Sequence, residues 1–250
     1  EFKRMVVPIN FSYKKYNIHF VIASYINPCG KDLKDSNYNQ CIKSNIDSVK
    51  DKICTGMPEL NILPLEPLII DKLIIFDAEN IKSNVKNIKT YGFCDFDVNS
   101  VYSNSDRNHI SLDFNLKHLQ LNGSYDFNAR LLTQIVYNGL IQITIDNLAV
   151  KVELNLKTIT KNGNKYSYVS KINFNLDIKD FDFKIDESRK ELADLYKIIK
   201  DIIDTNKKDI VKRVKSPIEK EVSERIISIL NDVFRRTNYE ELFPEKTRIV

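Results

Sequence analysis

Long runs in which apolar and polar residues alternate occupy the middle of this chain, and they constrain its fold more than any other feature. Between residues 110 and 117, Ile, Leu and Phe occupy every even position and polar residues every odd one. This period of two is typical of antiparallel strands that turn one face to a core and the other to water. The pattern predicts strands over residues 68–77, 85–102, 109–123, 124–139, 140–159 and 166–185.

Asparagine–glycine pairs separate several of these strands, and such pairs are strong signals for tight hairpins. Asn122-Gly123 and Asn138-Gly139 predict two such turns, and the stretch KNGNK (161–165) predicts a third. Strands of ten or more residues joined by tight turns form a long meander. Because long strands twist strongly, we expect this sheet to curl.

Helical spacing occurs both before and after the strands. Residues 36–55 carry an apolar stripe at intervals of three and four, and Gly56 follows where a helix commonly ends. Residues 188–204 carry a second stripe and predict a second helix. The two stripes are Ile42, Ile46, Val49 and Ile53, and Leu192, Leu195, Ile199, Ile202 and Ile203.

A third stripe has an apolar residue at every fourth position: Ile210, Val214, Ile218, Val222, Ile226, Leu230 and Phe234. Ser216, Pro217 and Glu219 together form a helix-start signature, which predicts two helices that break at Ser216. The apolar spacing crosses the proline without slipping, however, and this favours one kinked helix over residues 206–236. A step of four residues advances about 400°, so the stripe drifts around the helix and needs a partner that wraps around it.

The curled sheet is the available partner, so the expected fold is α+β: a long C-terminal helix wrapped by a highly curved antiparallel β-sheet, elongated and with an apolar tunnel. Periodicity alone leaves a second possibility open, because a filled core has the same pattern as a hollow one. In that case the protein would be a partner for other proteins rather than a carrier.

Composition and motifs exclude several classes of function. The net charge of +4 is too small for a strongly basic nucleic-acid binder, and with six glycines the chain has neither GxGxxG nor a P-loop. Three histidines without a Cys/His cluster offer no zinc site, and neither GxSxG nor HExxH occurs. We therefore expect no enzyme, no cofactor and no nucleic-acid partner.

The first residues and the cysteines bear on cellular location. Residues 1–27 have the order basic, apolar, small, which is that of a secretory leader, and residues 28–250 then form a single domain. Cys29 and Cys41 can close a small polar loop by a disulfide in a secreted protein, or all cysteines can be unpaired thiols. The pairing of Cys54 and Cys94 cannot be read from the sequence.

Two motifs, C-x11-C and GMPELNILPLEPL (56–68), resemble those of the insect takeout and juvenile-hormone-binding protein family. The prolines of the second motif predict an extended segment. The matching positions are Gly56, Pro58, Glu59, Leu60, Leu65, Glu66, Pro67 and Leu68, with looser matches at Gly92, Gly123, Tyr125, Gly139 and residues 242–244. The resemblance covers residues 28–246 and implies a secreted, monomeric carrier of small hydrophobic molecules such as terpenoids or fatty acids. It also implies the disulfide Cys29–Cys41.

The chain departs from juvenile hormone carriers, since it has no cysteine after Cys94 and Tyr137 replaces an expected glycine. It is therefore closer to the takeout proteins. Asn122 begins a glycosylation sequon, which we expect at a hairpin tip. We expect the ligand to contact Leu112, Phe114, Leu116, Tyr125, Tyr137, Phe174, Ile226, Leu230 and Phe234.

A second interpretation is a lipid-transfer module that engages membranes. The cluster Lys207, Lys208, Lys212 and Arg213 would then contact acidic lipid headgroups, and binding to liposomes would weaken with salt. A solvated helix face has the same pattern, so membrane contact is not our expectation.

Overall fold

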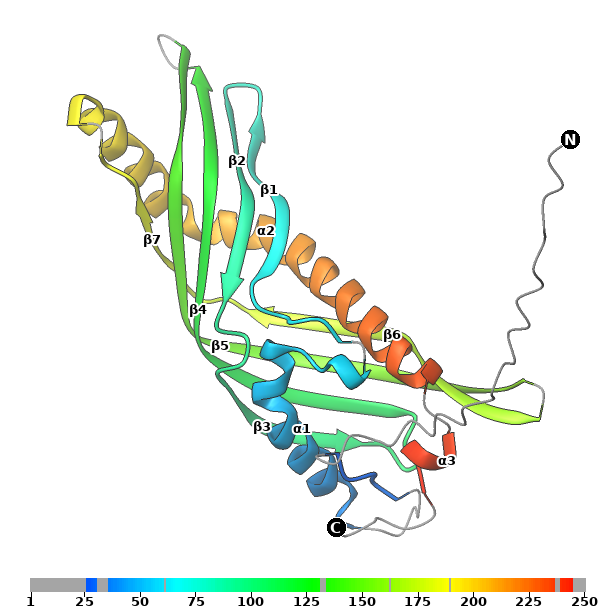
Figure 1. Cartoon of the computed structure of the whole chain (residues 1–250). Helices are drawn as coiled ribbons and strands as arrows, with labels where there is room; N and C mark the ends of the chain where they lie inside the picture. Colours follow the sequence, from blue (N-terminus) through cyan, green and yellow to red (C-terminus); the bar gives the residue numbers. More distant parts are fainter. Residues whose placement is uncertain are drawn as a thin grey trace, which may run out of the picture.

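A strongly curved antiparallel sheet and a long helix dominate the structure, a computed structural model (Figure 1). It describes residues 26–30, 36–60, 62–130, 134–161, 163–188, 190–236 and 239–244. The leader predicted over residues 1–27 lies outside the described residues except for its last two positions. The elements are α1 (Tyr38–Thr55), η1 (Pro58–Leu60), β1 (Leu68–Ala78), β2 (Ile81–Tyr91), β3 (Phe96–Ser103), β4 (His109–Arg130), β5 (Gln134–Lys161), β6 (Asn164–Asp177), β7 (Asp182–Ile185), η2 (Lys190–Leu192), α2 (Ala193–Arg236) and α3 (Tyr239–Leu242).

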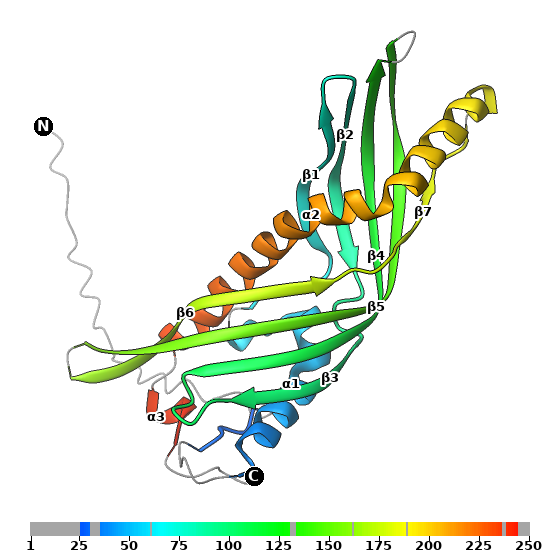
Figure 2. The ribbon, with the colours of Figure 1, turned by 180° about the vertical axis from the view of Figure 1, so that it is seen from behind.

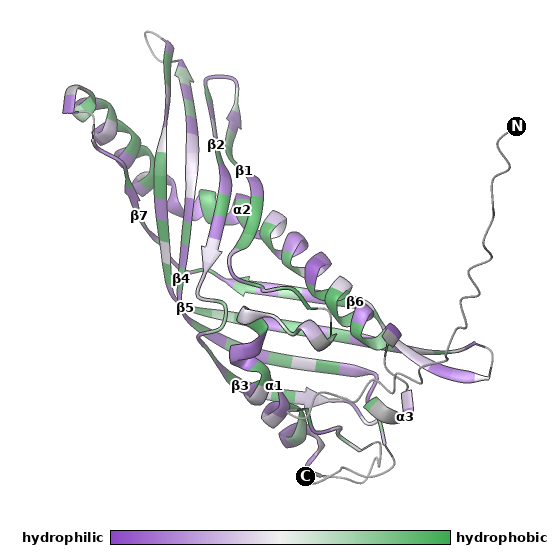
Figure 3. Ribbon diagram, in the orientation of Figure 1, coloured by the Kyte–Doolittle hydropathy of each residue, from purple (hydrophilic) through white to green (hydrophobic). Residues whose placement is uncertain are grey.

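Seven strands form the sheet in the order β1-β2-β4-β5-β6, while β3 pairs with β4 and β7 pairs with β5. Every pairing is antiparallel, as the alternating pattern predicted. Figure 3 shows the alternation directly, as hydrophilic and hydrophobic bands that follow one another along β4 and β5. The predicted turn at residues 161–165 is confirmed, with Lys161 paired to Asn164 and Gly163 at a φ of 77°.

The two other predicted hairpins are wrong. Gly123 lies inside β4 and Gly139 inside β5, and both strands continue without a turn for 22 and 28 residues. Packing explains both glycines. A Cβ atom on Gly123 would lie 2.9 Å from Cγ1 of Val85, and one on Gly139 would lie 3.0 Å from Cε1 of Tyr125. These glycines let neighbouring side chains approach the backbone.

A sharp bend crosses the sheet and divides it into two halves (Figure 1). In β4 the buried, inward-facing residues occupy even positions up to Leu116 and odd positions from Leu119. In β5 the inward-facing residues change from odd to even positions between Ile145 and Leu148. Two predicted strands, 85–102 and 166–185, are interrupted at the same level, between β2 and β3 and between β6 and β7. We call residues 92–95, 117–118, 146–147 and 178–181 the bend, the part with β1, β2 and β7 the β7 half, and the part with β3 and β6 the β6 half.

Helix α2 is continuous over 44 residues and is about 66 Å long. The favoured prediction of one helix across Pro217 is confirmed, and the alternative of a break at Ser216 is excluded. The two predicted helices, 188–204 and 206–236, are joined in one. Figures 1 and 2 show α2 running across the concave side of the sheet, past the bend and along both halves. A wrapped helix was predicted from the drifting stripe, and this arrangement confirms it.

Polar side chains of α2 reach both edge strands of the sheet. At the β1 edge, Nη2 of Arg225 donates a hydrogen bond of 2.8 Å to the carbonyl oxygen of Ile69. At the β6 edge, Asn231 accepts from the N–H of Val169 at 2.7 Å and donates to its carbonyl oxygen at 3.1 Å. Exposed edges invite pairing with other chains, and α2 satisfies them instead. The helix therefore bridges the β1 and β6 edges along the concave side of the sheet.

Helix α1 protects the β3 edge in a similar way. Lys43 donates to the carbonyl oxygen of Val98 at 2.8 Å, and Lys50 donates to that of Phe96. Because β3 pairs only with β4, these lysines satisfy acceptors that would otherwise face solvent.

Two disulfides, Cys29–Cys41 and Cys54–Cys94, fasten α1 to the rest of the chain. The first is the bond that the resemblance implied, and the second ties the end of α1 to the bend. Cys54, Glu66 and Cys94 are the potential metal ligands that gather among the described residues, but two of them are consumed by the disulfide.

The segment after α1 turns back on itself rather than extending. Residues 58–60 form a 3-10 turn, and the N–H groups of Met57 and Ile62 donate to each other's carbonyl oxygens at 2.8 and 3.0 Å. Leu63 is 80% exposed, so it does not line the interior. Glu66 accepts a hydrogen bond from the N–H of Gly92 at 2.8 Å and so connects this segment to the bend.

Candidate ligand-binding site

An apolar cavity of about 70 Å³ lies between α2 and the β7 half of the sheet. Its walls come from five strands or their extensions and from one helix, and every lining residue is apolar. The lining residues are Leu73, Ile75, Val85, Ile88, Leu121, Gly123, Ile141, Ile143, Ile145, Ile178, Phe181, Ile210, Val211, Val214 and Ile218. Sites for small molecules commonly measure roughly 300–1,000 Å³, so this cavity holds only a small part of a lipid.

The apolar interior continues past the bend into the β6 half. There the inward rows of β4, β5 and β6 include large side chains that are only half-buried, although their neighbours in the same rows, Leu112 and Val152, are buried. Ile226 and Leu230 continue the α2 stripe and are also half-buried. The half-buried residues of the sheet are Phe114, Leu154, Ile172 and Phe174. An accessible apolar wall therefore adjoins the apolar cavity.

The nine residues predicted to contact ligand are spread over this interior. Leu112, Leu116, Tyr125 and Tyr137 are buried members of the main core, and Phe114 and Phe174 pack partly buried against it. Ile226, Leu230 and Phe234 lie on the C-terminal part of α2, where the ring of Phe234 stacks on Phe243 at 6.5 Å between centroids. None of these nine residues lines the apolar cavity.

The residues of the cavity walls were not among the predicted ligand contacts. Ile210, Val214 and Ile218 were visible as the first part of the drifting stripe. The sheet residues were visible only as members of alternating rows, and nothing in a row marks the position over which the helix leaves a space.

Three tyrosines form a polar cluster inside the β7 half. The hydroxyl groups of Tyr137 and Tyr196 are 2.9 Å apart, and the ring of Tyr137 lies edge-on to that of Tyr196 at 5.7 Å. Tyr125 packs against Tyr137 with 6.0 Å between centroids. This cluster places phenolic oxygens within an otherwise apolar core, where they can recognise a polar group of a ligand.

Thr90 contributes a buried hydroxyl on the inward side of β2. It is 2% exposed, and its Oγ1 has no hydrogen-bond partner among the described residues. Buried hydroxyl groups are almost always hydrogen-bonded in folded proteins. Thr90 therefore marks a second position where a polar atom from a water or a ligand fits.

The basic cluster of α2 is partly engaged within the protein. Lys207 lies 3.2 Å from Asp180, and its ammonium group is 5.3 Å from the centre of the Phe181 ring. A hydrogen bond from the N–H of Phe181, assisted by Lys207, lowers the pKa of Asp180. Lys208, Lys212 and Arg213 remain exposed on the helix.

The sequon at Asn122 lies in the middle of β4, so the expected hairpin tip is wrong. Asn122 pairs with Lys89 on one side and Gln142 on the other, and its side chain accepts a hydrogen bond from Gln120 at 3.3 Å. It borders an open hollow of about 630 Å³. Glycosylation at Asn122 stays a prediction.

No helix in the described part of the chain combines the length and the apolar character that crossing a bilayer requires.

Comparisons with known proteins place this fold. The crystal structure of Takeout 1 from Epiphyas postvittana matches with a TM-score of 0.68 and 18% sequence identity, over 88% of this chain and 100% of that chain. Weaker matches are the crystal structures of a lipopolysaccharide binding protein (TM-score 0.38, 13% identity, 82% of this chain and 41% of that chain) and of Mmm1 (0.24, 10%, 73% and 74%). No curated protein matches the sequence significantly.

Family models give a broader match. The model of the haemolymph juvenile hormone binding proteins matches residues 14–244, which is most of the chain. The takeout structure shares the arrangement of a curved sheet and a long helix. The chain therefore belongs to the haemolymph juvenile hormone binding protein family.

Proposed function

We propose that this protein is a secreted, non-enzymatic carrier of a small hydrophobic molecule, such as a terpenoid, a fatty acid or a related lipid. The ligand lies between α2 and the curved sheet. The observation that carries the proposal is the accessible apolar wall of the β6 half, which adjoins a cavity lined only by apolar side chains. Large inward-facing side chains of a filled core are usually buried, whereas several in this wall are only half-buried.

The hydrophobic effect can supply the affinity. Burial of each methylene contributes about 0.8 kcal/mol, so a ligand with ~15 of them gains about 12 kcal/mol. Association costs at least about 4 kcal/mol, which leaves about 8 kcal/mol, the free energy of a micromolar complex. Such a ligand is too large for a space of about 70 Å³, so most of it must lie in the β6 half or the cavity must widen.

Three features support secretion. Both described disulfides are of the kind that persists in oxidising compartments, and the family is named for proteins of the haemolymph. The order of residues at the N-terminus agrees with a leader.

Native mass spectrometry and probe displacement test the proposal. Protein purified without denaturant is expected to carry a lipid-sized mass, and an unlabelled terpenoid or fatty acid is expected to displace a fluorescent fatty acid. If no mass is retained and no hydrophobic probe binds, the protein is not a carrier. Salt-sensitive binding to acidic liposomes without a soluble complex would instead support a membrane-engaging module.

Substitutions in α2 locate the site. Val214 lines the cavity, so Val214→Phe fills part of it and is expected to weaken probe binding at least tenfold. Ile198→Phe is the matched control, since Ile198 is 38% exposed on the same helix and lies outside the cavity lining. Equal affinities in the two variants would contradict a site at this part of α2.

A further inference from the structure

The sheet has a gap beside the apolar cavity. β6 pairs with β5 as far as Asp177 opposite Ala149, and β7 resumes pairing with Asp182 opposite Thr144. Four residues lie between these points on each strand, so β6 and β7 hold the same register on β5. The gap is therefore a stretch in which β5 and the segment between β6 and β7 do not pair. Neither strand has an extra residue there.

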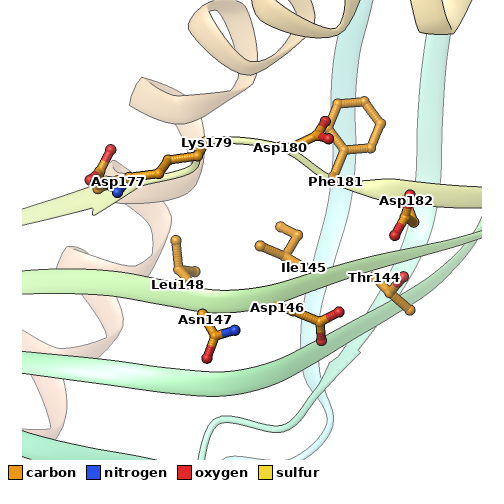
Figure 4. A pocket seen from close by; sticks show the side chains of 10 residues that line it. All are labelled: Thr144, Ile145, Asp146, Asn147, Leu148, Asp177, Lys179, Asp180, Phe181 and Asp182. Carbon is orange, nitrogen blue, oxygen red and sulfur yellow. Dashed lines mark ion pairs between the residues drawn. The ribbon is translucent and has the colours of Figure 1, made fainter.

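A pocket of about 290 Å³ occupies this gap. Figure 4 shows side chains from both sides of the gap lining the space, and Ile145 extends from β5 into it. Ile145 and Phe181 also line the apolar cavity under α2, so these two side chains belong to both spaces. The pocket on the sheet is separated from the cavity by little more than these two residues.

Contacts with α2 hold the gap open. Phe181 is 9% exposed and forms a buried cluster with Ile210 and Val214 of α2. Lys207 of the same helix pairs with Asp180 and lies over the ring of Phe181. The segment 178–181 therefore packs on the helix instead of pairing with β5. Asn147, opposite it on β5, has a φ of 53°, an unfavourable conformation that interrupts regular strand geometry.

We propose that this gap is a lateral entrance through which the ligand passes between solvent and the cavity under α2, with Phe181 as the side chain that moves aside. The proposal rests on the proposed function and adds the route of exchange. The ends of the molecule need not open. Because β6 and β7 hold the same register on β5, residues 178–181 can move toward β5 or away from it while the paired parts of the strands stay in place. Phe181 and Ile145 offer an apolar surface to the passing ligand.

The charge at the entrance selects the class of ligand. Four carboxylates line it, from Asp146, Asp177, Asp180 and Asp182, against the single cation of Lys179. Lys179 pairs with Asp177 at 3.9 Å and Lys207 pairs with Asp180 at 3.2 Å, so the excess negative charge of the entrance lies on Asp146 and Asp182. An ionised fatty acid is repelled at such a mouth. The entrance therefore favours neutral lipids, such as long-chain alcohols and esters.

Closing the gap covalently tests the entrance. Asp146 and Asp180 are exposed and would face each other if the register continued, so the variant Asp146→Cys with Asp180→Cys places two thiols across it. All four native cysteines are disulfide-bonded, so a short bifunctional thiol reagent meets only the new pair. Stopped-flow fluorescence with a fluorescent long-chain alcohol then measures exchange. We expect both association and dissociation rates to fall at least tenfold, with Kd within twofold.

The matched control is Lys151→Cys with Asn175→Cys, since these exposed residues are directly paired between β5 and β6. Crosslinking there is expected to leave both rates within twofold of those of the native chain. If crosslinking across the gap also leaves the rates unchanged, ligand enters elsewhere and the proposal is overturned. If the native chain binds no hydrophobic probe at all, the carrier function itself fails, and the entrance fails with it.

A second variant needs no crosslink. Phe181→Leu makes the moving side chain smaller, and we expect both rates to rise severalfold while circular dichroism stays unchanged. Charge gives a further readout. The fluorescent alcohol is expected to associate faster than the fluorescent fatty acid of the same length, and the difference to shrink at high salt. Equal rates for the two probes at low salt would contradict the selection of neutral ligands.

Discussion

Gly139 shapes the interior because it has no side chain and so leaves room for the ring of Tyr125. The two residues face each other on β5 and β4, and the ring of Tyr125 occupies the space where a Cβ atom of residue 139 would lie. From this position Tyr125 packs on Tyr137, which in turn contacts Tyr196. The tyrosine cluster therefore depends on the glycine.

Gly139→Ala is expected to destabilise the protein by about 1–3 kcal/mol, because the new methyl group meets the Tyr125 ring 3.0 Å away. Urea unfolding followed by circular dichroism measures the loss. In the background Tyr125→Leu the ring is gone, and the same substitution is expected to cost less. If the two backgrounds give equal costs, contact with the ring is not the reason for the glycine.

Thr90→Val tests the orphaned hydroxyl. Because it replaces a buried, unpartnered hydroxyl by a methyl group of similar shape, we expect it to stabilise the ligand-free protein by about 1–3 kcal/mol. Weaker binding of ligands with a polar head group would accompany this if the hydroxyl contacts the ligand. Thr160→Val, at an exposed position of β5, is the control and is expected to change stability by less than about 0.5 kcal/mol. A destabilised Thr90→Val variant would show that the hydroxyl has a partner after all.

Elements with strong periodicity were predictable from the sequence, whereas their boundaries were not. The stripe from Ile210 to Phe234 predicted a long wrapped helix, and alternation predicted the strands. An Asn-Gly pair has the same sequence in a turn and under a packed ring, so β4 and β5 were each cut in two. The second disulfide was also out of reach, since four cysteines allow three pairings.

The bend had a partial signal. The strand predicted over residues 166–185 has its apolar residues at even positions from Ile172 to Ile178 and at odd positions from Phe181. A change of parity within a strand marks a bulge or a break, because successive side chains alternate between faces. Where the unpaired backbone goes depends on α2, which is distant in the sequence, so the gap itself could not be predicted.

Edge protection by α2 gives a prediction for Asn231. Val169 is 2% exposed, so Asn231→Ala leaves a buried N–H and a buried carbonyl without their partner and is expected to cost about 1–3 kcal/mol. Hydrogen exchange at the Val169 amide is expected to accelerate at the same time. Asn206→Ala is the control, since that side chain donates only to Ile202 one turn back in α2. The prediction fails if both variants unfold at the same urea concentration.

The two disulfides are expected to differ in their contribution to stability. In the chain-entropy account, a bond stabilises in proportion to the logarithm of the loop that it closes. The bonds span separations of 40 and 12 residues, so removing Cys54–Cys94 is expected to cost about 4 kcal/mol and removing Cys29–Cys41 about 3 kcal/mol. Paired Cys→Ala variants compared by urea unfolding measure the order. A larger loss without Cys29–Cys41 would mean that the N-terminal segment contributes folded-state contacts beyond the loop.

The whole molecule encloses its interior with a helix rather than with more strands. β1 and β6 are the ends of the sheet, and side chains of α2 bond to the backbone of both, including Glu219, which accepts from the N–H of Leu176 at 2.8 Å. A barrel made only of strands has a diameter set by strand number and shear. A helix that bridges two edges can instead shift slightly while the sheet keeps its pairing. We therefore expect the interior to widen when a ligand binds.

This arrangement predicts how affinity depends on ligand length. In a series of unbranched alcohols, each added methylene is expected to tighten binding about fourfold, because its burial contributes about 0.8 kcal/mol. The gain stops when the chain fills the interior from the cavity under Val214 to the accessible wall near Phe174. Val214→Phe blocks one end of this path, so its plateau is expected at shorter alcohols, whereas Ile198→Phe keeps the native plateau. Displacement titrations across the series measure both curves. Affinity that does not change with chain length would exclude an interior site and leave only adsorption at the surface.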